Sequence, residues 1–353
     1  MKILSVATAH PPHYHSQETL LSAIQDVWDS KHHNSARVAQ MFRAVMVGGR
    51  HLALPLDAYP KLNGFGEANT AFIRVGTDVA EQAIRTALDE AHLAPTDVDA
   101  IFFASVTGVS APSIDALLVN RLGLRPDVKR IPIFGLGCVA GVAGTSRLHD
   151  YLKAYPNHVG VLVCVELCSL TLQREDMSIP NLIASGLFGD GAAAVLACGA
   201  DRASTPPSGP NTIATESRFY PDTEGVMGWN ISERGFQIVL QATVPKLVHA
   251  HIRDDVDQFL SKHDLSRADI GSWVCHTGGP KVLDAFKAAL ELDDEALALT
   301  WESLKEVGNL SSASVLYVLR DTIRTRTPTP GTKGMMLAMG PGFCAEMVLM
   351  EWT

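Results

Sequence analysis

DVDAIFFA, at residues 97–104, is the stretch that decides the fold, because its pattern returns as ADIGSWVC at residues 268–275. In each copy a polar turn leads into an apolar strand, which is followed by Thr-Gly and a helix that starts at Pro112 or Pro280. Short apolar runs bounded by turn residues are typical of buried strands. The stretch therefore predicts a strand-helix unit that occurs twice.

The spacing of three such matches indicates that the chain is a duplication. Pro112 and Pro280 are 168 residues apart, Cys138 and Asn309 are 171 apart, and the strands at 160–165 and 334–339 are 174 apart. A near-constant offset over several elements is the mark of an internal repeat. We therefore predict an α/β fold with halves at 1–200 and 212–353, joined by a Ser/Pro-rich linker at 201–211. A single doubly wound sheet is the alternative, but it does not explain the offset.

Composition limits the kinds of function that the chain can have. The 353 residues are 46% hydrophobic and 19% charged, which is ample for a large core. The net charge of −9 and the lack of a dense Lys/Arg block disfavour a nucleic-acid binder. No apolar run reaches the length of a membrane span. The six cysteines form no CxxC pair, so we expect a reduced, cytoplasmic protein without a metal site.

Cys138 is the first candidate for chemistry. It follows an apolar strand through Gly135 and Gly137 and opens a helix of small residues. The N-terminus of a helix favours a thiolate and lowers the pKa of a thiol. The alternative is that Cys138 is a small buried hydrophobe, as most cysteines are.

His276 and Asn309 are the second and third candidates. His276 ends the repeated strand at 272–275, and Asn309 precedes a helix at the position that matches Cys138. By themselves they read as a core histidine and a helix N-cap. Loops of two related halves converge on one centre, however, and a thiol, an imidazole and an amide donor together suit acyl transfer from a thioester.

These residues belong to motifs that resemble those of the type III polyketide synthases. The motifs occupy residues 135–141, 186–194, 276–280, 308–314 and 339–343. The chain resembles the chalcone/stilbene synthase superfamily in motif order over nearly its whole length, and is most similar to bacterial alkylpyrone and alkylresorcinol synthases. The resemblance implies the thiolase fold, with duplicated halves in αβαβα layers, and a homodimer. It also implies acyl-CoA and malonyl-CoA as substrates, with no separate cofactor.

The resemblance further implies a mechanism. Cys138 would carry the starter acyl group, while His276 and Asn309 would hold the malonyl-CoA carbonyl during decarboxylation and condensation. Phe188 matches the phenylalanine that gates the acyl cavity in this family. A second gating position falls near both Phe236 and Ile238.

Other residues match family positions that line the cavity or bind CoA. The acyl and cyclisation cavity would be lined by Thr107, Ala111, Cys168, Thr171, Gly228, Ser311, Met339, Gly340, Pro341 and Gly342. CoA would be bound by Arg37, Arg43, Arg50, Gly278, Gly279 and Lys281. Because Ala111 and Cys168 are small, we expect a medium- to long-chain acyl starter and an alkyl-α-pyrone or alkylresorcinol product.

Two other functions fit part of the pattern. A ketoacyl-acyl carrier protein synthase III uses the same three residue types, but its catalytic His normally precedes Gln-Ala-Asn, whereas His276 precedes Thr-Gly-Gly-Pro. A catalytically silent acyl-CoA-binding protein is the alternative of another class. The complete set of Cys138, His276 and Asn309 argues against it.

Overall fold

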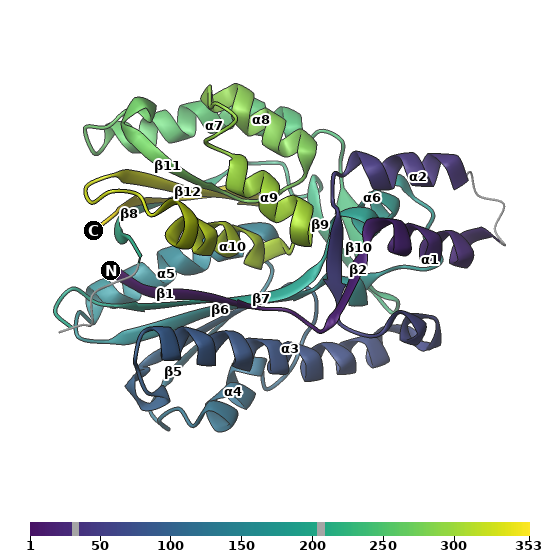
Figure 1. Ribbon diagram of the computed structural model, residues 1–353, viewed down its shortest axis with the longest axis horizontal. Coiled ribbons are helices and arrows are strands. Elements are labelled where there is room, and N and C mark those ends of the chain that lie inside the picture. The colour runs from purple at the N-terminus through teal and green to yellow at the C-terminus, as the bar shows by residue number, and fades with distance from the viewer. Residues whose placement is uncertain (30–34, 203–208) are drawn as a thin grey trace.

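Five layers, in the order αβαβα, make up the molecule (Figure 1). The computed structural model describes residues 1–29, 35–202 and 209–353. The predicted linker 201–211 therefore lies largely outside the described residues. No helix among the described residues is both long enough and apolar enough to cross a membrane.

Nine hydrogen-bonded strands run through the two β layers. In sheet order they are β11 (Ile270–Cys275), β12 (Lys333–Gly340), β13 (Cys344–Glu351), β8 (Asn211–Phe219), β1 (Lys2–Ala9), β7 (Asp190–Cys198), β6 (Val159–Leu167), β4 (Ala100–Ala104) and β5 (Lys129–Ile133). In both halves a parallel pair, β4 with β6 or β11 with β12, is followed by two antiparallel pairings. The halves meet where Lys2 of β1 pairs with Asn211 of β8. This repeated order confirms the predicted duplication.

The helices repeat in the same way. One outer layer holds α3 (Gly64–Glu90) and α4 (Ile114–Leu122), and the other holds α7 (Val244–Ser261) and α8 (Pro280–Leu290) (Figure 1). The layer between the β layers contains α5 (Ala140–Ala154), α9 (Ala298–Val307) and α10 (Ser314–Asp321). The thiolase-like fold is thus confirmed.

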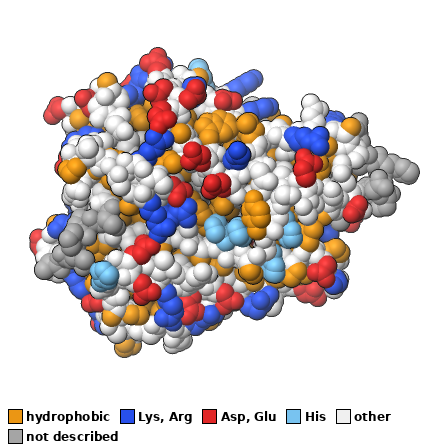
Figure 2. Space-filling view, in the orientation of Figure 1, with side chains coloured by type: hydrophobic (Ala, Val, Ile, Leu, Met, Phe, Trp, Pro, Cys, Tyr) orange, Lys and Arg blue, Asp and Glu red, His pale blue; other side chains and the backbone are white. Residues whose placement is uncertain are grey.

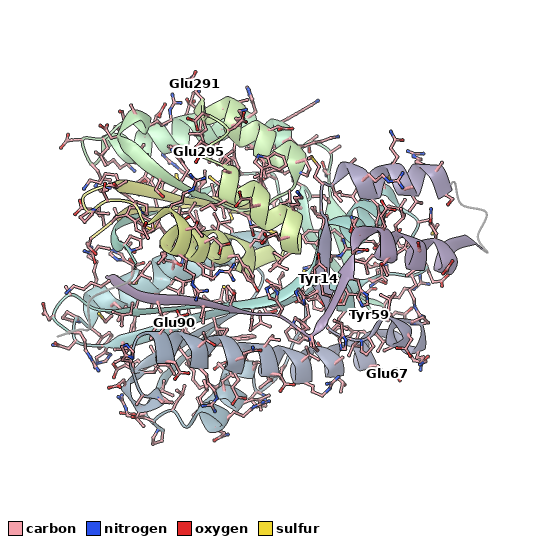
Figure 3. The ribbon with its side chains drawn as sticks, viewed as in Figure 1. Tyr14, Tyr59, Glu67, Glu90, Glu291 and Glu295 are labelled. Atoms are coloured by element: carbon pink, nitrogen blue, oxygen red, sulfur yellow. The ribbon has the colours of Figure 1, made fainter. Side chains whose placement is uncertain are left out.

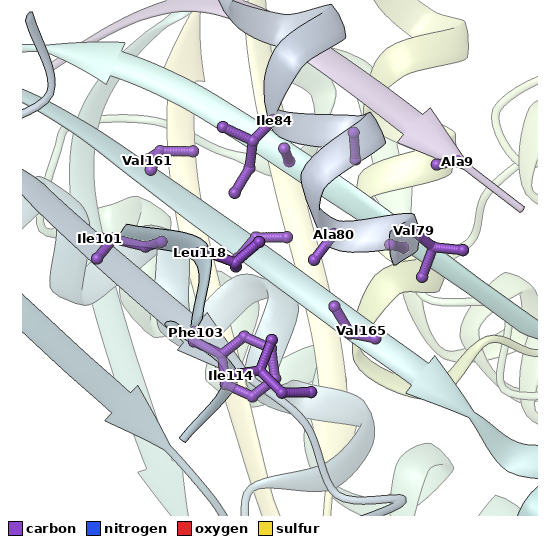
Figure 4. Packing of buried hydrophobic residues seen from close by; sticks show 14 of the residues in the cluster. Ala9, Val79, Ala80, Ile84, Ile101, Phe103, Ile114, Leu118, Val161 and Val165 are labelled. Carbon is purple, nitrogen blue, oxygen red and sulfur yellow. The ribbon is translucent and has the colours of Figure 1, made fainter. Parts of the chain in front are cut away.

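Apolar packing of α3 on the N-terminal strands forms one of the cores (Figure 4). Ile84 of α3 faces Val161 of β6, and Phe103 of β4 packs beside Ile114 of α4. All four side chains are at most 6% exposed. Near-continuous apolar strands are expected where a sheet is covered on both faces.

A cap at one end of the layers carries part of the predicted cavity. It contains β2 (His13–Ser16), α1 (Gln17–Asp29), α2 (Ser35–Ala44), β3 (Gly49–Leu52), α6 (Ile179–Leu187), β9 (Met227–Ser232) and β10 (Gly235–Leu240). Short 3₁₀ turns lie at Leu56–Lys61, Pro95–Asp97, Gly137–Val139, Cys168–Thr171, Arg267–Asp269 and Ser311–Ala313, and a π turn lies at Thr322–Arg326.

Candidate active site

Three loops bring Cys138, His276 and Asn309 to one cavity of about 30 Å³. Cys138 lies in the turn between β5 and α5, His276 directly follows β11, and Asn309 lies between α9 and α10. The residues come from both halves of the duplication. Their convergence is what the sequence pattern predicted.

Glycine makes the close approach around Cys138 possible. Gly137 has a φ of +56°, and a Cβ there would lie 2.8 Å from the ring of Pro341. A Cβ on Gly340 would lie 2.8 Å from the backbone nitrogen of Val139. The predicted cyclisation loop is therefore packed directly against the turn that carries the thiol.

Burial controls the protonation of Cys138, which is 8% exposed. Removal from water, to which the nearby charge of Glu166 adds, raises the pKa of the thiol to about 12. The Sγ atom lies 3.7 Å from the hydroxyl oxygen of Ser311, a contact that acts in the opposite direction. The expectation that the helix N-terminus would leave this pKa lowered is wrong, because desolvation outweighs the effect of the helix.

His276 presents an unpartnered ring to the cavity. It is 3% exposed, and within the described residues neither Nδ1 nor Nε2 has a hydrogen-bond partner. Burial lowers the pKa of the ring to about 4, so the imidazole is neutral at pH 7. A neutral imidazole carries one N–H donor, and an unpaired buried polar group is costly unless a ligand satisfies it. The ring is thus suited to receive an oxygen of a substrate.

Asn309 is held by its oxygen, which leaves its nitrogen for a ligand. Oδ1 accepts hydrogen bonds from the backbone N–H of Ser311, at 2.8 Å, and from the Ser314 hydroxyl, at 3.3 Å. Asn309 does not cap a helix, because Leu310 and Ala313 hold the N-cap positions, so the capping role that sequence reasoning considered is not found; its side chain forms a local turn instead. This turn fixes which end of the amide faces the cavity, so the Nδ2 group is oriented as a donor.

Glu166 is a buried carboxylate beside the catalytic cavity, and sequence reasoning did not identify it. It is fully buried in β6 and accepts hydrogen bonds from Val106 N at 3.1 Å, Thr107 Oγ1 at 2.9 Å and Ser312 Oγ at 2.5 Å. Burial raises its pKa to about 7. A lone Glu inside the apolar run 159–167 was the signal that could have found it, because buried charges need partners.

Two larger cavities lie beyond the catalytic one. Phe188 lines both the catalytic cavity and a mainly apolar cavity of about 520 Å³. The apolar cavity is also lined by Cys168, Thr171 and Ile238. Phe188 therefore stands at the boundary where the family resemblance expects a gate.

The third cavity, of about 500 Å³, is more polar and is lined by Thr107 and Phe236. The two candidates for the second gate thus face different cavities, with Ile238 on the apolar one and Phe236 on the polar one. Ala111 and Gly228 line none of the three cavities. The expectation that Ala111 enlarges the acyl cavity of its own chain is wrong, since Ala111 is exposed at the surface.

The predicted CoA-binding residues differ in their surroundings, since some are buried and others are exposed. Arg50 is 3% exposed, and its guanidinium donates to Gln17 Oε1 and to the carbonyl oxygens of Ser185 and Gly186. These internal acceptors bind Nη1 and Nη2, while the buried Nε has no hydrogen-bond partner among the described residues; Arg50 thus has a structural role, and the expectation that it binds phosphate is not supported. Arg43 is exposed and pairs with Glu18 at 3.2 Å.

The remaining CoA candidates lie elsewhere. Arg37 and Lys281 are exposed, Gly278 lines the catalytic cavity, and Gly279 precedes α8 with a φ of +108°. Figure 2 shows acidic and basic side chains interspersed over the face in view. Binding of a polyanionic substrate therefore has to depend on local groups. Across 1–29, 35–202 and 209–353, no group of three or more His, Cys, Asp or Glu residues could hold a metal ion.

The fold and the cavity together define a class of protein. A thiol, a neutral imidazole and an oriented amide donor, in one closed cavity of a thiolase-like fold, are the groups of a condensing enzyme that acts on thioesters. The family model for the N-terminal domain of chalcone and stilbene synthases matches residues 1–202, and that for the C-terminal domain matches residues 212–352. The chain belongs to the chalcone and stilbene synthase family and is a bacterial type III polyketide synthase.

Individual relatives agree with this assignment. The chain is 51% identical to the 1,3,6,8-tetrahydroxynaphthalene synthase of Streptomyces peucetius subsp. caesius, over 99% of this chain and 93% of the relative. It is 30% identical to the phloroglucinol synthase of Pseudomonas fluorescens, over 97% of both. The crystal structure of 1,3,6,8-tetrahydroxynaphthalene synthase from Streptomyces coelicolor A3(2) superimposes with a TM-score of 0.94 at 30% identity, over 100% of this chain and 99% of that one.

Membership of this family also decides between the functions that the sequence left open. The protein is an acyltransferase that uses CoA thioesters as substrates, and its family requires no separate cofactor. A carrier-dependent ketoacyl synthase and a silent acyl-CoA-binding protein are both set aside.

Proposed function

We propose that Cys138 carries the growing chain, while His276 and Asn309 hold the thioester carbonyl of malonyl-CoA. The observation that supports this most directly is the unpartnered His276 ring, which shares a small buried cavity with the Cys138 thiol and the oriented Asn309 amide. Two N–H donors on one carbonyl oxygen stabilise the negative charge that forms there.

The proposed reaction has three steps, which are loading, decarboxylation and condensation. In loading, the thiol of Cys138 attacks the starter thioester, CoA leaves as a thiol, and the thiol proton passes to the departing sulfur. In extension, malonyl-CoA loses CO₂, and the electron pair of the broken bond forms an enolate on the oxygen held by His276 and Asn309. The enolate carbon then attacks the acyl group on Cys138, which forms the carbon–carbon bond and releases the cysteine sulfur.

For the product, we propose a polyhydroxylated aromatic compound of the tetrahydroxynaphthalene type, made from malonyl-CoA alone. The support is the relative at 51% identity, which is a 1,3,6,8-tetrahydroxynaphthalene synthase. Each malonyl unit leaves two carbons after decarboxylation, so five units supply all the carbons of a naphthalene.

A second candidate is an alkyl-α-pyrone or alkylresorcinol made from a medium- to long-chain acyl-CoA starter. It is favoured by the apolar cavity of about 520 Å³ behind Phe188, which is lined in part by the small side chain of Cys168. A cavity of this size and polarity is suited to an alkyl chain.

One assay separates the two candidates. Purified protein is incubated with malonyl-CoA alone, or with malonyl-CoA and saturated acyl-CoA starters of increasing length, and products are identified by mass spectrometry. Efficient turnover of malonyl-CoA alone, with fatty starters giving minor products, supports the naphthalene product, whereas absolute dependence on a fatty starter supports the alkyl product. Cys138→Ala is the control, and full activity in that variant would contradict the role of Cys138.

Further features of the protein are proposed on the same basis. We propose a homodimer, supported by the exposed aromatic rings of Phe134 and Phe219. We propose that Arg37, Arg43 and Lys281 contact CoA phosphates. The halves 1–200 and 212–353 are proposed as the duplicated units, and a cytoplasmic location is proposed from the substrates and the free thiols.

A further inference from the structure

The apolar and polar cavities share one wall. Tyr59, Ser169, Leu172 and Arg174 line both of them. Phe188 lines both the catalytic cavity and the apolar one, so the apolar cavity has residues in common with each of the other two cavities. Figure 3 shows Tyr59 near the N-terminal end of α3, at the cap end of the molecule.

Hydrogen bonds from the core hold the Tyr59 ring in this wall. The Tyr59 hydroxyl lies 2.5 Å from Ser169 Oγ and accepts a hydrogen bond from Leu54 N at 3.2 Å. The Ser169 hydroxyl donates to the buried carboxylate of Asp190, which also accepts from Ser169 N at 2.8 Å and from Ala53 N at 2.6 Å. Because the serine proton points to Asp190, Tyr59 is the donor to Ser169.

A second set of bonds fixes the segment that carries Tyr59. The Arg174 guanidinium donates to the carbonyl oxygens of Pro60, at 2.7 Å, and Leu62, at 2.8 Å. These bonds join parts of the chain that are more than 100 residues apart in sequence. The wall is therefore built from directed polar contacts, which fix the ring more precisely than apolar packing alone.

We propose that Tyr59 determines how long a chain the enzyme can hold, with Ser169 and Asp190 as its positioning residues. This inference rests on the proposed function only in that the acyl chain starts at Cys138. The ring is part of the wall that the apolar cavity of about 520 Å³ shares with the polar cavity of about 500 Å³. Removing the ring joins the two and roughly doubles the space beyond Phe188.

The experiment measures binding and products in parallel. Equilibrium binding of saturated acyl-CoAs of increasing length is measured by calorimetry for the parent and for Tyr59→Ala. Each buried CH₂ group is worth about fourfold in affinity, so the parent gains affinity up to a limiting length and Tyr59→Ala continues to gain beyond it. Tyr59→Trp moves the limit in the opposite direction, whereas Tyr59→Phe keeps the ring but loses its bond to Ser169, so its limit should lie between those of the parent and Tyr59→Ala.

Leu62→Ala is the matched control, because Leu62 lines the polar cavity but not the apolar one. It should bind the same lengths as the parent. An unchanged limit in both Tyr59→Ala and Tyr59→Trp would overturn the proposal, and so would an equal increase in Leu62→Ala. Mass spectrometry of the products tests the proposed function separately from the role of Tyr59. A parent protein that makes no polyketide refutes the proposed function, whereas the limiting chain length in the binding experiment still tests the role of Tyr59.

Discussion

Asn309→Asp isolates the donor role of the Asn309 side chain. In the parent, Oδ1 accepts from Ser311 N and Ser314 Oγ, so only Nδ2 is left for a substrate. An aspartate keeps an oxygen for these two donors and replaces the nitrogen by a second oxygen. Asn309→Ala, in contrast, removes the anchor and the donor together.

The magnitude follows from the loss of one donor to the developing oxyanion. Removing such a donor typically lowers kcat by about 10²–10³, or about 3–4 kcal/mol. We expect this loss in the decarboxylation of malonyl-CoA for Asn309→Asp at pH 8. Asn309→Ala should lower stability at every pH, because it loses two buried hydrogen bonds worth about 1 kcal/mol each, whereas Asn309→Asp should lose stability only as the pH rises and its buried carboxyl ionises.

The activity of Asn309→Asp should also depend on pH, with part of the lost activity returning at lower pH. Burial raises the pKa of the nearby Glu166 to about 7, and it raises the pKa of a carboxyl introduced at position 309 in the same direction. As the pH falls from 8 to 6, the new carboxyl takes up a proton and becomes an O–H donor. Activity of Asn309→Asp should therefore rise as the pH falls, by up to about tenfold per pH unit.

The assay is the formation of acetyl-CoA from malonyl-CoA in a Cys138→Ala background, which removes loading and condensation. Thermal unfolding is measured on the same samples. Asn309→Asp activity within threefold of its parent at pH 8 would refute the donor role. At pH 6, where the new carboxyl is protonated, a melting temperature of Asn309→Asp as low as that of Asn309→Ala would refute the anchoring of Oδ1.

Three further predictions concern the groups around the site. The carboxyl of Glu166 has a pKa of about 7 in the folded protein, against 4.5 when unfolded, so between these pH values the folded state holds a proton that the unfolded state has lost. The carboxyl therefore destabilises the fold increasingly as the pH rises, and Glu166→Gln should remove this destabilisation. In urea unfolding, the stability of the variant relative to the parent should rise by about 3 kcal/mol between pH 4.5 and 7, and a pH-independent difference contradicts this. Arg50→Met should lower the free energy of unfolding by about 3 kcal/mol, because three oxygens lose a charged donor at about 1 kcal/mol each. KM for malonyl-CoA should stay within twofold of the parent, whereas a large KM increase at unchanged stability would restore a phosphate-binding role. Gly137→Ala should cost about 1–3 kcal/mol, since it places a Cβ at a φ of +56° and against Pro341, and an unchanged melting temperature would show that the loop yields.

The sequence by itself determined the duplication and indicated which polar groups would meet. A near-constant offset between repeated strand-helix units is a local pattern, and it predicted the duplicated halves that the structure shows. The convergence of Cys138, His276 and Asn309 followed from topology, because equivalent loops of two related halves meet at one centre. Motif positions then placed Phe188 at a cavity boundary.

Tertiary structure alone decided protonation, partners and cavity boundaries. Each depends on which groups lie within a few ångströms, and sequence neighbours do not report this. Burial set the direction of the Cys138 pKa, against the helix terminus that the sequence suggested. Internal carbonyl oxygens occupied Arg50, and chain geometry left Ala111 at the surface. The wall at Tyr59 exists only because Ser169 and Asp190, more than 100 residues away in sequence, fold against it.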